Sequence, residues 1–238
     1  MSRRPGRSLP DVEELPQGED KVRAVRQMFD TIAPRYDLVN RVMTFGLDVR
    51  WRKRTVRDLA LAPRSRVLDL ACGTGDLCRE LKASGFRAIG VDLSFGMLAA
   101  ARTDAPLVQA DILRLPVADA SVEGVTCGFA LRNLVELPAF FAELARVVRP
   151  GGRVALLEVA EPRNALLKAG HSVYFGKVVP RIGALLSDPA AYRYLPKSVA
   201  YLPAPSVMLD QLRAAGFDDV RRVLLFPGAA QLLTGTRR

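Results

Sequence analysis

The chain has 238 residues, of which 49% are hydrophobic, and a formal net charge of +10 with a sequence pI near 10.1. This length and apolar content suffice for one full hydrophobic core, so we expect one principal α/β domain rather than two independent ones. Apolar runs stay below the roughly 18 residues that span a bilayer, and no apolar segment follows the arginines of residues 1–10. We therefore expect a cytoplasmic protein without a membrane span or a signal peptide.

The excess of positive charge is typical of proteins that meet nucleic acid, an anionic membrane surface or an acidic ligand, and it does not distinguish them. Cys72, Cys78, Cys127 and the single histidine, His171, lack the paired spacing of a zinc site or a disulfide framework. We expect no metal site, and we expect the three thiols to serve as small buried apolar groups.

The first quarter of the chain is predicted to be helical after a short leader. Residues 1–20 are rich in proline, glycine, arginine and acids, which predicts a flexible leader. Residues 21–61 show helical periodicity and precede the first strand, so we expect a helical cap at the ligand end of that strand. Its helices are expected at 21–32, 36–45 and 48–61.

Residues 66–159 alternate between strand and helix patterns, which predicts a doubly wound parallel sheet. Strands are expected near 66–71, 87–92, 106–109, 122–128 and 152–159. Helices are expected near 75–84, 94–103 and 136–148. Residues 161–205 break this rhythm and are predicted to form a helical insertion, followed by a helix at 206–215 and strands at 218–226 and 228–237. Residues 21–238 would thus form one domain.

The most informative stretch is Val67–Asp76, an apolar run that ends in Gly73-Thr74-Gly75 and is followed, after a helical pattern, by a second apolar run ending in Asp92. This is the layout of a parallel βαβ unit that holds a nucleoside. The glycines let the backbone turn sharply, and the next helix N-terminus attracts a carboxylate. Asp92 is placed to accept both hydroxyls of a ribose. The pattern predicts an adenosine-containing cofactor.

Two further observations narrow the cofactor. A dinucleotide fingerprint needs a third glycine three residues after the second, and here that position is Cys78. A triphosphate loop needs Gly-Lys-Ser/Thr, which does not follow the glycines. The sequence therefore favours S-adenosylmethionine. The alternative is an ordinary strand–turn–helix whose glycines serve chain geometry only.

Additional motifs from about residue 21 to the C-terminus resemble one enzyme family, the quinone-ring C-methyltransferases of menaquinone and ubiquinone biosynthesis. They are Tyr36-Asp37-Leu38-Val39-Asn40, Gly46 with Trp51, Phe129-Ala130-Leu131-Arg132-Asn133, Arg146 to Gly152 with Glu158, and Ala191 to Leu195 with Ser198. The resemblance implies a class I S-adenosylmethionine-dependent methyltransferase fold with a seven-stranded, mostly parallel sheet. It also implies demethylmenaquinol or a related polyprenyl quinol as the substrate.

The same resemblance suggests cofactor contacts for Thr74 in the loop, for Asp92, for Asp111 and Ile112 beside adenine, and for Gly128 at the end of the fourth strand. A carboxylate at position 111 can accept from the adenine amino group, although a turn-forming acid would explain it too. The predicted cofactor-binding residues are Asp69, Gly73, Thr74, Gly75, Asp92, Asp111, Ile112 and Gly128.

Methylation of a ring carbon needs a quinol that is at least partly ionised at oxygen and in line with the methyl–sulfur bond. A phenol has a pKa of about 10, so a neighbouring guanidinium would stabilise the anion. We predict Arg132 in that role, with Asn133 as a hydrogen-bonding partner. Tyr36 and Asp37 are predicted to position the quinol or a water that takes its proton. The plainer interpretation makes Arg132 a surface ion-pair residue and Tyr36 a packing residue.

Departures from the family's usual residues concern the acceptor rather than the cofactor loop. Asp48 stands where the family commonly has histidine, and would act as a base or as a helix N-cap. Ala130 and Ala160 replace glycine and serine, and Gly228–Leu233 departs from the C-terminal pattern. A methyltransferase for another phenolic, polyketide or lipid-like molecule is therefore the alternative. An RNA methyltransferase and a non-catalytic cofactor-binding protein are further rivals, but the basic residues are not interleaved with aromatics, so no nucleic acid is expected.

Two features suggest contact with lipid. The tyrosine and phenylalanine side chains of residues 174–201 would line a tunnel for a prenyl tail, or else pack the core of the insertion. Arg50, Arg54 and Arg57 share a helix face, which would rest on anionic headgroups or remain solvated. The expected partners are a polyprenyl quinol or another apolar phenol and the inner face of the membrane, with a homodimer left open.

Overall fold

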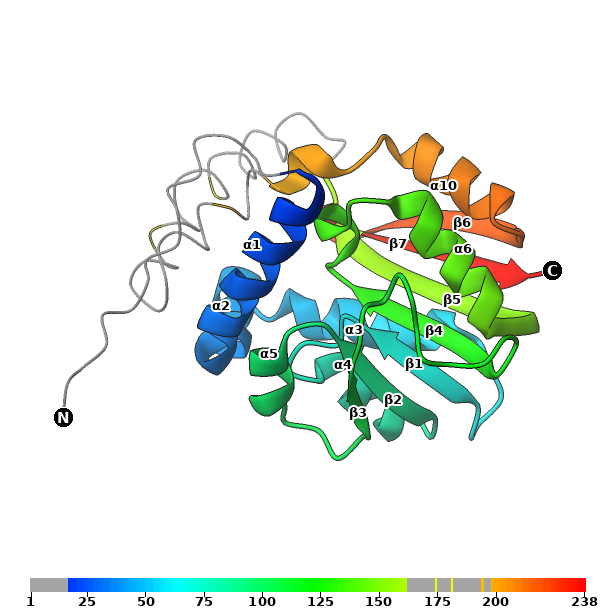
Figure 1. The fold of residues 1–238 in the computed structure, drawn as a ribbon, viewed down its shortest axis with the longest axis horizontal. Coiled ribbons are helices and arrows are strands. Elements are labelled where there is room, and N and C mark those ends of the chain that lie inside the picture. Colours follow the sequence, from blue (N-terminus) through cyan, green and yellow to red (C-terminus); the bar gives the residue numbers. More distant parts are fainter. Residues whose placement is uncertain (1–16, 162–173, 175–180, 182–193, 195–197) are drawn as a thin grey trace.

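The computed structural model describes residues 17–161, 174, 181, 194 and 198–238. Within them the chain forms one seven-stranded sheet with helices on both faces and a group of helices over one end (Figure 1). Residues 1–16 of the predicted leader and most of the predicted insertion at 161–205 lie outside the described residues.

The sheet has the strand order β3-β2-β1-β4-β5-β7-β6. Strands β1 to β5 are parallel, whereas β7 is antiparallel to both of its neighbours. Because the order reverses between β1 and β4, a crevice is expected at the carboxyl ends of these strands. The bounds are β1 Arg66–Leu70, β2 Arg87–Asp92, β3 Leu107–Gln109, β4 Val122–Gly128, β5 Val148–Val159, β6 Phe217–Leu225 and β7 Ala230–Arg237.

Burial along the strands follows their place in the sheet. Central β1 and β4 are buried along nearly their whole length, as expected for strands covered by helices on both faces. Edge strand β3 has only three residues, none of them buried. A short edge strand offers little backbone for unwanted pairing.

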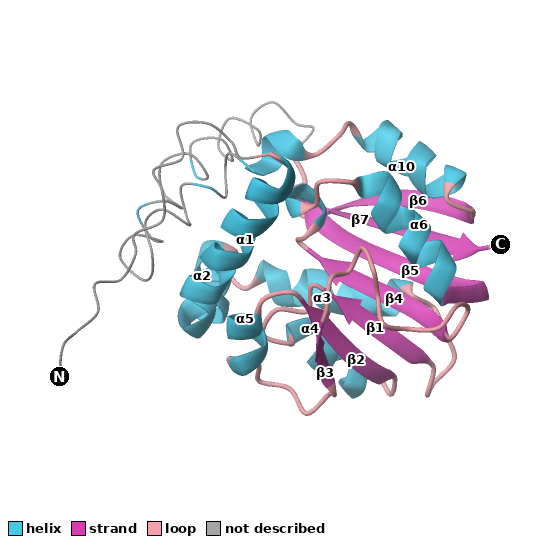
Figure 2. Ribbon diagram, viewed as in Figure 1, coloured by secondary structure: helices cyan, strands magenta, loops and turns pink. Residues whose placement is uncertain are grey.

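Two helical layers cover the sheet (Figure 2). Phe140 and Phe141 of α6 and Met208 of α10 are buried in a cluster with strand residues on one face. Trp51 of α3 and Leu77 of α4 belong to a second cluster on the other face. Residues 47–58 of the expected cap therefore pack against the sheet itself. The bounds are α3 Leu47–Asp58, α4 Asp76–Ala83, α6 Leu137–Val147 and α10 Pro205–Ala214.

The remaining helices lie over the carboxyl ends of the parallel strands, where Figure 1 shows α1 and α2 beside α5. Their buried side chains, among them Met28, Val39 and Met97, form a third cluster of their own. This layer covers the crevice at the carboxyl ends of the parallel strands. Its elements are α1 Gly18–Ile32, η1 Ala33–Arg35, α2 Tyr36–Met43 and α5 Phe95–Ala99.

Several boundaries differ from the sequence prediction. Helix α2 ends at Met43 instead of 45, α3 ends at Asp58 instead of 61, and β5 begins at Val148 instead of 152. Helix α1 begins at Gly18, so residues 18–20 are helical rather than part of a leader. Helix α5 ends at Ala99 instead of continuing to 103, because Arg102 N–H donates to the Thr74 carbonyl and the Thr103 hydroxyl accepts from Ala105 N–H. Among the described residues, no helix is long and apolar enough to cross a membrane.

Candidate active site

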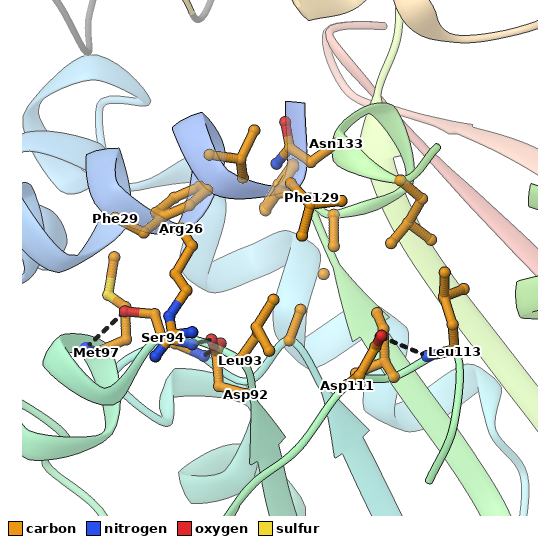
Figure 3. A pocket seen from close by; sticks show the side chains of 18 of the residues that line it. Arg26, Phe29, Asp92, Leu93, Ser94, Met97, Asp111, Leu113, Phe129 and Asn133 are labelled. Carbon is orange, nitrogen blue, oxygen red and sulfur yellow. Dashed lines mark hydrogen bonds between the residues drawn. The ribbon is translucent and has the colours of Figure 1, made fainter. Parts of the chain in front are cut away.

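A pocket lies between α1, the start of α2 and the carboxyl ends of β1, β2 and β4 (Figure 3). The strand side contributes Ala71, Gly73, Asp92, Asp111 and Gly128, each at or just after a strand end. The helical side is lined by Val22, Val25, Arg26, Phe29 and Tyr36, and the loop after β4 by Phe129, Ala130, Asn133, Leu134 and Val135. The pocket therefore has one wall from the sheet and one from the helical layer.

The glycine loop after β1 requires glycine on steric grounds. Gly75, the N-cap of α4, has φ 83°, and a Cβ there would lie 2.5 Å from Cγ2 of Thr103. Gly73 has φ 55°, and its N–H donates to Oδ2 of Asp92 at 2.7 Å. The loop and the end of β2 are thus locked together, and Gly73 lies in the pocket wall.

Asp92 is 9% exposed, and its carboxylate is held by backbone donors. Its second oxygen, Oδ1, accepts from Ser94 N–H at 2.8 Å. Desolvation by burial raises the pKa of this carboxyl, against the opposing effect of the hydrogen bonds from Ser94 and Gly73. Each carboxylate oxygen has two lone-pair directions, so Asp92 retains acceptor capacity toward the pocket. That capacity suits ribose hydroxyls.

The loop after β3 contributes a polar and an apolar group to the pocket. Asp111 Oδ1 accepts from Leu113 N–H at 2.9 Å, so one oxygen forms the turn that the sequence allowed as an alternative role (Figure 3). The other oxygen remains available to an amino group. Ile112 is 7% exposed and offers an apolar surface beside it, and Gly128 keeps the β4 end free of a side chain.

Three of the predicted cofactor-binding residues, Asp69, Thr74 and Gly75, are not among the pocket-lining residues. Asp69 is fully buried, accepts from the Thr126 hydroxyl at 2.8 Å and from the Cys78 thiol at 3.4 Å. Burial raises its pKa to about 7. Thr74 donates to the carboxylate of Asp37. These three residues hold the loop in shape and do not contribute to the pocket surface.

Arg132 is buried, so the interpretation of it as a surface ion-pair residue is wrong. Its guanidinium donates to Glu158 at 2.5 Å, to the Phe129 carbonyl at 2.8 Å and to the Ser198 hydroxyl at 3.2 Å. Its side chain is 5% exposed and that of Glu158 is fully buried. The arginine lies behind the wall of the pocket and fixes the loop that includes Asn133.

Of the other residues predicted to act on the acceptor, two line the pocket and one contacts the glycine loop behind it. Tyr36 lines the pocket and packs edge-to-face on Phe29, with ring centroids 5.8 Å apart. Burial raises the pKa of its phenol, which therefore stays protonated at neutral pH. Asn133 also lines the pocket and accepts from the Tyr194 hydroxyl at 3.2 Å. Asp37 faces the glycine loop through Thr74 instead.

Asp48 is not a helix N-cap, because Gly46 occupies that position of α3. Its carboxylate is 2% exposed, lies 2.5 Å from the Arg52 guanidinium and accepts from the Thr44 hydroxyl at 2.8 Å. It does not line the pocket. Of the aromatic residues proposed for a prenyl tunnel, Phe175 and Tyr192 lie outside the described residues.

Sequence reasoning missed a set of anchors in α1. Lys21 is 3% exposed, and its ammonium donates to the carbonyls of Arg132 and Leu134 at 3.0 and 2.9 Å. It also lies 3.6 Å from the centre of the Tyr201 ring, and burial lowers its pKa to about 8. Asp30 accepts from the Ser94 hydroxyl at 2.5 Å. A lysine and an aspartate on an amphipathic helix give no signal of such distant partners.

Arg26 was missed for the same reason. It lines the pocket, and Figure 3 shows its side chain extending from α1 toward the segment that contains Asp92 and Ser94. Its positive charge faces the buried end of β2, where the carboxylate of Asp92 lies. A basic residue on the exposed turn of a helix is usually solvated, so the sequence alone did not distinguish it.

The residues fit S-adenosylmethionine. A carboxylate with spare acceptor capacity at the β2 end, an acid beside an apolar side chain after β3, and side-chain-free backbone at Gly73 and Gly128 match ribose, adenine and the amino-acid part. A model of the ubiE/COQ5 methyltransferase family matches residues 17–237. The chain belongs to the ubiE/COQ5 methyltransferase family. It is an S-adenosylmethionine-dependent methyltransferase.

Relatives and a solved structure agree with this assignment. The demethylmenaquinone methyltransferase of Roseiflexus sp. (strain RS-1) is 44% identical over 94% of this chain and 98% of its own. The ubiquinone/menaquinone biosynthesis C-methyltransferase UbiE of Syntrophotalea carbinolica is 43% identical over 89% and 93%. A Thermotoga maritima structure titled as a SAM-dependent methyltransferase, possible histamine N-methyltransferase, has a TM-score of 0.63 at 19% identity and covers 89% of this chain and 99% of its own. That last likeness shows the fold.

Proposed function

We propose that this enzyme transfers a methyl group from S-adenosylmethionine to a ring carbon of demethylmenaquinol or a close polyprenyl quinol. The family and the relatives named above support C-methylation in quinone biosynthesis. The observation that carries the proposal is the pocket, which joins a polar cofactor wall at the strand ends to an apolar wall from α1 and α2. A flat aromatic ring suits the space between Phe29, Tyr36 and Phe129.

The cofactor, when bound, supplies an electrophilic methyl group. We propose that Asp92 binds its ribose, Asp111 and Ile112 its adenine, and Gly73 and Gly128 its amino-acid part, all from the pocket wall. Asp69, Thr74 and Gly75 then act as supports that hold the loop. The cap helix α1 excludes water from the same space, which strengthens electrostatic interactions inside it.

On the acceptor side, the protonated phenol of Tyr36 is proposed to donate a hydrogen bond to a quinol oxygen. Because the oxygen of Asn133 already accepts from Tyr194, its amide NH₂ is left as a second donor. Arg132 is proposed to act from behind the wall. Because Glu158 neutralises most of its charge, we propose that its main effect is to hold Asn133 in place through its hydrogen bonds.

An acceptor panel tests the proposal. Purified protein, S-adenosylmethionine and reduced demethylmenaquinone with a short prenyl chain should give a product heavier by one methylene, whereas the oxidised quinone should give none. Tyr36→Phe should lower kcat by roughly 10- to 100-fold, the loss of one hydrogen bond to a charged oxygen, with little change in affinity for S-adenosylhomocysteine. Methylation of a different phenol or polyketide, with the quinol left unchanged, would contradict the proposal.

The membrane contact expected from the sequence also remains a proposal. A polyprenyl chain partitions into a bilayer because each buried methylene contributes about 0.8 kcal/mol, so the enzyme would meet its substrate at the membrane surface. The basic net charge of +10 is suited to anionic headgroups.

A further inference from the structure

Helix α2 carries buried and exposed apolar side chains on two adjacent faces, about 100° apart around the helix axis. Val39 and Met43 are buried under the cap, whereas Leu38 and Val42, four residues apart, are 58% and 40% exposed. Phe45 follows in the turn after the helix and is 78% exposed. We call Leu38, Val42 and Phe45 the α2 stripe. Apolar side chains this exposed and gathered on one side of a helix indicate a contact surface.

The surroundings of the stripe are basic. Arg35 and Arg41 are exposed and lie on either side of Leu38 in the helical projection, and Arg50 is exposed in the first turns of α3. The guanidinium of Arg41, half exposed, lies 3.6 Å from the carboxylate of Asp76, whose side chain is 10% exposed. Long arginine side chains can hold their charge at lipid headgroups while neighbouring apolar groups enter the acyl region.

The helix that bears the stripe also forms a wall of the active site. Tyr36 lies at the start of α2 and lines the pocket from the side opposite Leu38. The turn after α2 is held by Tyr174, whose hydroxyl donates to the Met43 carbonyl at 2.9 Å and whose ring lies 5.5 Å from that of Phe45. Only helix α2 therefore separates a surface that contacts the stripe from the part of the pocket lined by Tyr36.

We propose that the α2 stripe docks on an anionic lipid bilayer, with Leu38, Val42 and Phe45 entering the interface and the flanking arginines binding headgroup phosphates. The inference rests on the proposed function, since a quinol dissolved in the bilayer gives the docking its purpose. A second copy of the chain is disfavoured as the occupant. Three side chains can bury much less surface than a stable protein–protein interface, which buries about 800 Å² on each partner. In a dimer formed through the stripe, the flanking arginines of the two copies would also repel one another.

Vesicle sedimentation tests the docking surface. Wild-type protein should bind phosphatidylglycerol–phosphatidylcholine vesicles and bind pure phosphatidylcholine much more weakly. Combined Leu38→Ser, Val42→Ser and Phe45→Ser should lower the partition coefficient for anionic vesicles by at least about tenfold. Val207→Ser on α10, where the valine is 43% exposed, is the matched control and should change it less than about twofold. Equal binding by the stripe variant would overturn the proposal.

Two further measurements separate the outcomes. In Phe45→Trp, brominated lipid should quench the new tryptophan, while Trp51, 7% exposed, gives the background measured in wild type. Sedimentation velocity reports assembly: if the stripe substitutions convert a dimer to a monomer, a second copy covers the stripe and the lipid proposal fails. Unchanged thermal unfolding of the stripe variant would show that it folds.

Activity distinguishes this proposal from the function itself. The stripe variant should methylate a water-soluble short-chain quinol at the wild-type rate and lose activity on a long-chain quinol presented in anionic vesicles. Vesicle binding without methylation of any quinol would support the docking surface and reject the substrate. Methylation of both quinols by the variant at wild-type rates would reject the docking surface alone.

Discussion

The two walls of the pocket are built in different ways. On the cofactor wall each residue lies at or just after the end of a strand, and the main contact, between Gly73 N–H and Asp92, stays within one βαβ unit, 19 residues apart. The other wall, formed by α1, α2 and the loop after β4, is here called the acceptor wall. Its contacts span the chain: Lys21 binds carbonyls more than 100 residues away, and Arg132 binds Glu158 and Ser198.

This difference decides how each wall responds to substitution. Glycine geometry and the backbone N–H groups bound to the Asp92 carboxylate hold the cofactor wall, so a changed side chain there, other than Asp92, should affect ligand affinity more than folding. Buried charges hold the acceptor wall, so removal of one partner leaves the other uncompensated. On that wall, loss of activity and loss of stability are expected together.

The largest effect is expected for Arg132→Ala. Loss of the guanidinium leaves the fully buried Glu158 without its charge partner, which should lower the free energy of unfolding by about 3–5 kcal/mol. Urea unfolding measures it. Arg54→Ala is the matched control, since Arg54 binds Asp58 at the surface and should contribute at most about 1 kcal/mol. Equal losses in the two variants would show that the Arg132 pair does not hold the acceptor wall.

Because of that expected loss, inactivity of Arg132→Ala alone does not establish a role in catalysis. Combining it with Glu158→Gln should restore part of the stability, since the remaining side chain is then neutral. If stability returns and methylation does not, the charge of Arg132 matters to the reaction itself.

Asp92→Ala should weaken S-adenosylhomocysteine binding about a hundredfold or more, because two charge-assisted hydrogen bonds to ribose contribute about 1.5 kcal/mol or more each. Calorimetric titration measures the affinity. Asp111→Ala is expected to lose about tenfold, since one of its oxygens forms the local turn with Leu113. An Asp92→Ala variant with wild-type affinity would remove the assignment of the β2 end as the ribose site.

Gly75→Ala tests the steric requirement of the cofactor wall against a matched glycine. Gly75 and Gly151 have φ 83° and 77°, but a Cβ at 75 meets Thr103 at 2.5 Å whereas one at 151 has nothing within 4 Å. Alanine at position 75 should therefore lower the free energy of unfolding by about 1–3 kcal/mol more than alanine at position 151. Combining Gly75→Ala with Thr103→Ser, which removes the clashing methyl group, should recover part of this difference. If Gly75→Ala and Gly151→Ala lower the free energy of unfolding equally, the loop moves to relieve the contact.

A further effect concerns the pH dependence of the free energy of unfolding. Burial raises the pKa of Asp69 to about 7 from 3.8, so the folded state holds a proton that the unfolded state has released between these values. Stability from this group is present below about pH 4 and is lost as pH rises to about 7, with a slope of at most about 1.4 kcal/mol per pH unit. Asp69→Asn should lack that loss. If the free energies of unfolding of wild type and Asp69→Asn changed with pH in parallel, the raised pKa of Asp69 would be contradicted.

The sequence could predict the cofactor wall because its signals are local. Glycines at 73 and 75 and acids at the ends of two apolar runs determine backbone shape and position within one βαβ unit, and the observed strands agree closely with those runs. The family motifs also named Tyr36 and Asn133, which line the pocket.

The acceptor wall could not be predicted in the same way. Its geometry depends on which distant groups meet, and neither Lys21 beside the carbonyls of the 131–134 loop nor Arg26 in the pocket leaves a periodic or spacing signal. The short α5 had a similar cause, because Thr74 and Thr103 supply hydrogen bonds that compete with the helix. Long-range polar contacts override local propensity here.

The central claim, methyl transfer to a quinol ring carbon, is tested most directly with S-adenosylmethionine carrying a deuterated methyl group. After incubation with reduced demethylmenaquinone, mass spectrometry and NMR should locate the label on a ring carbon, in a product that still undergoes reversible two-electron oxidation to the quinone. Label on a phenolic oxygen, or no labelled quinol while the cofactor binds, would contradict the account.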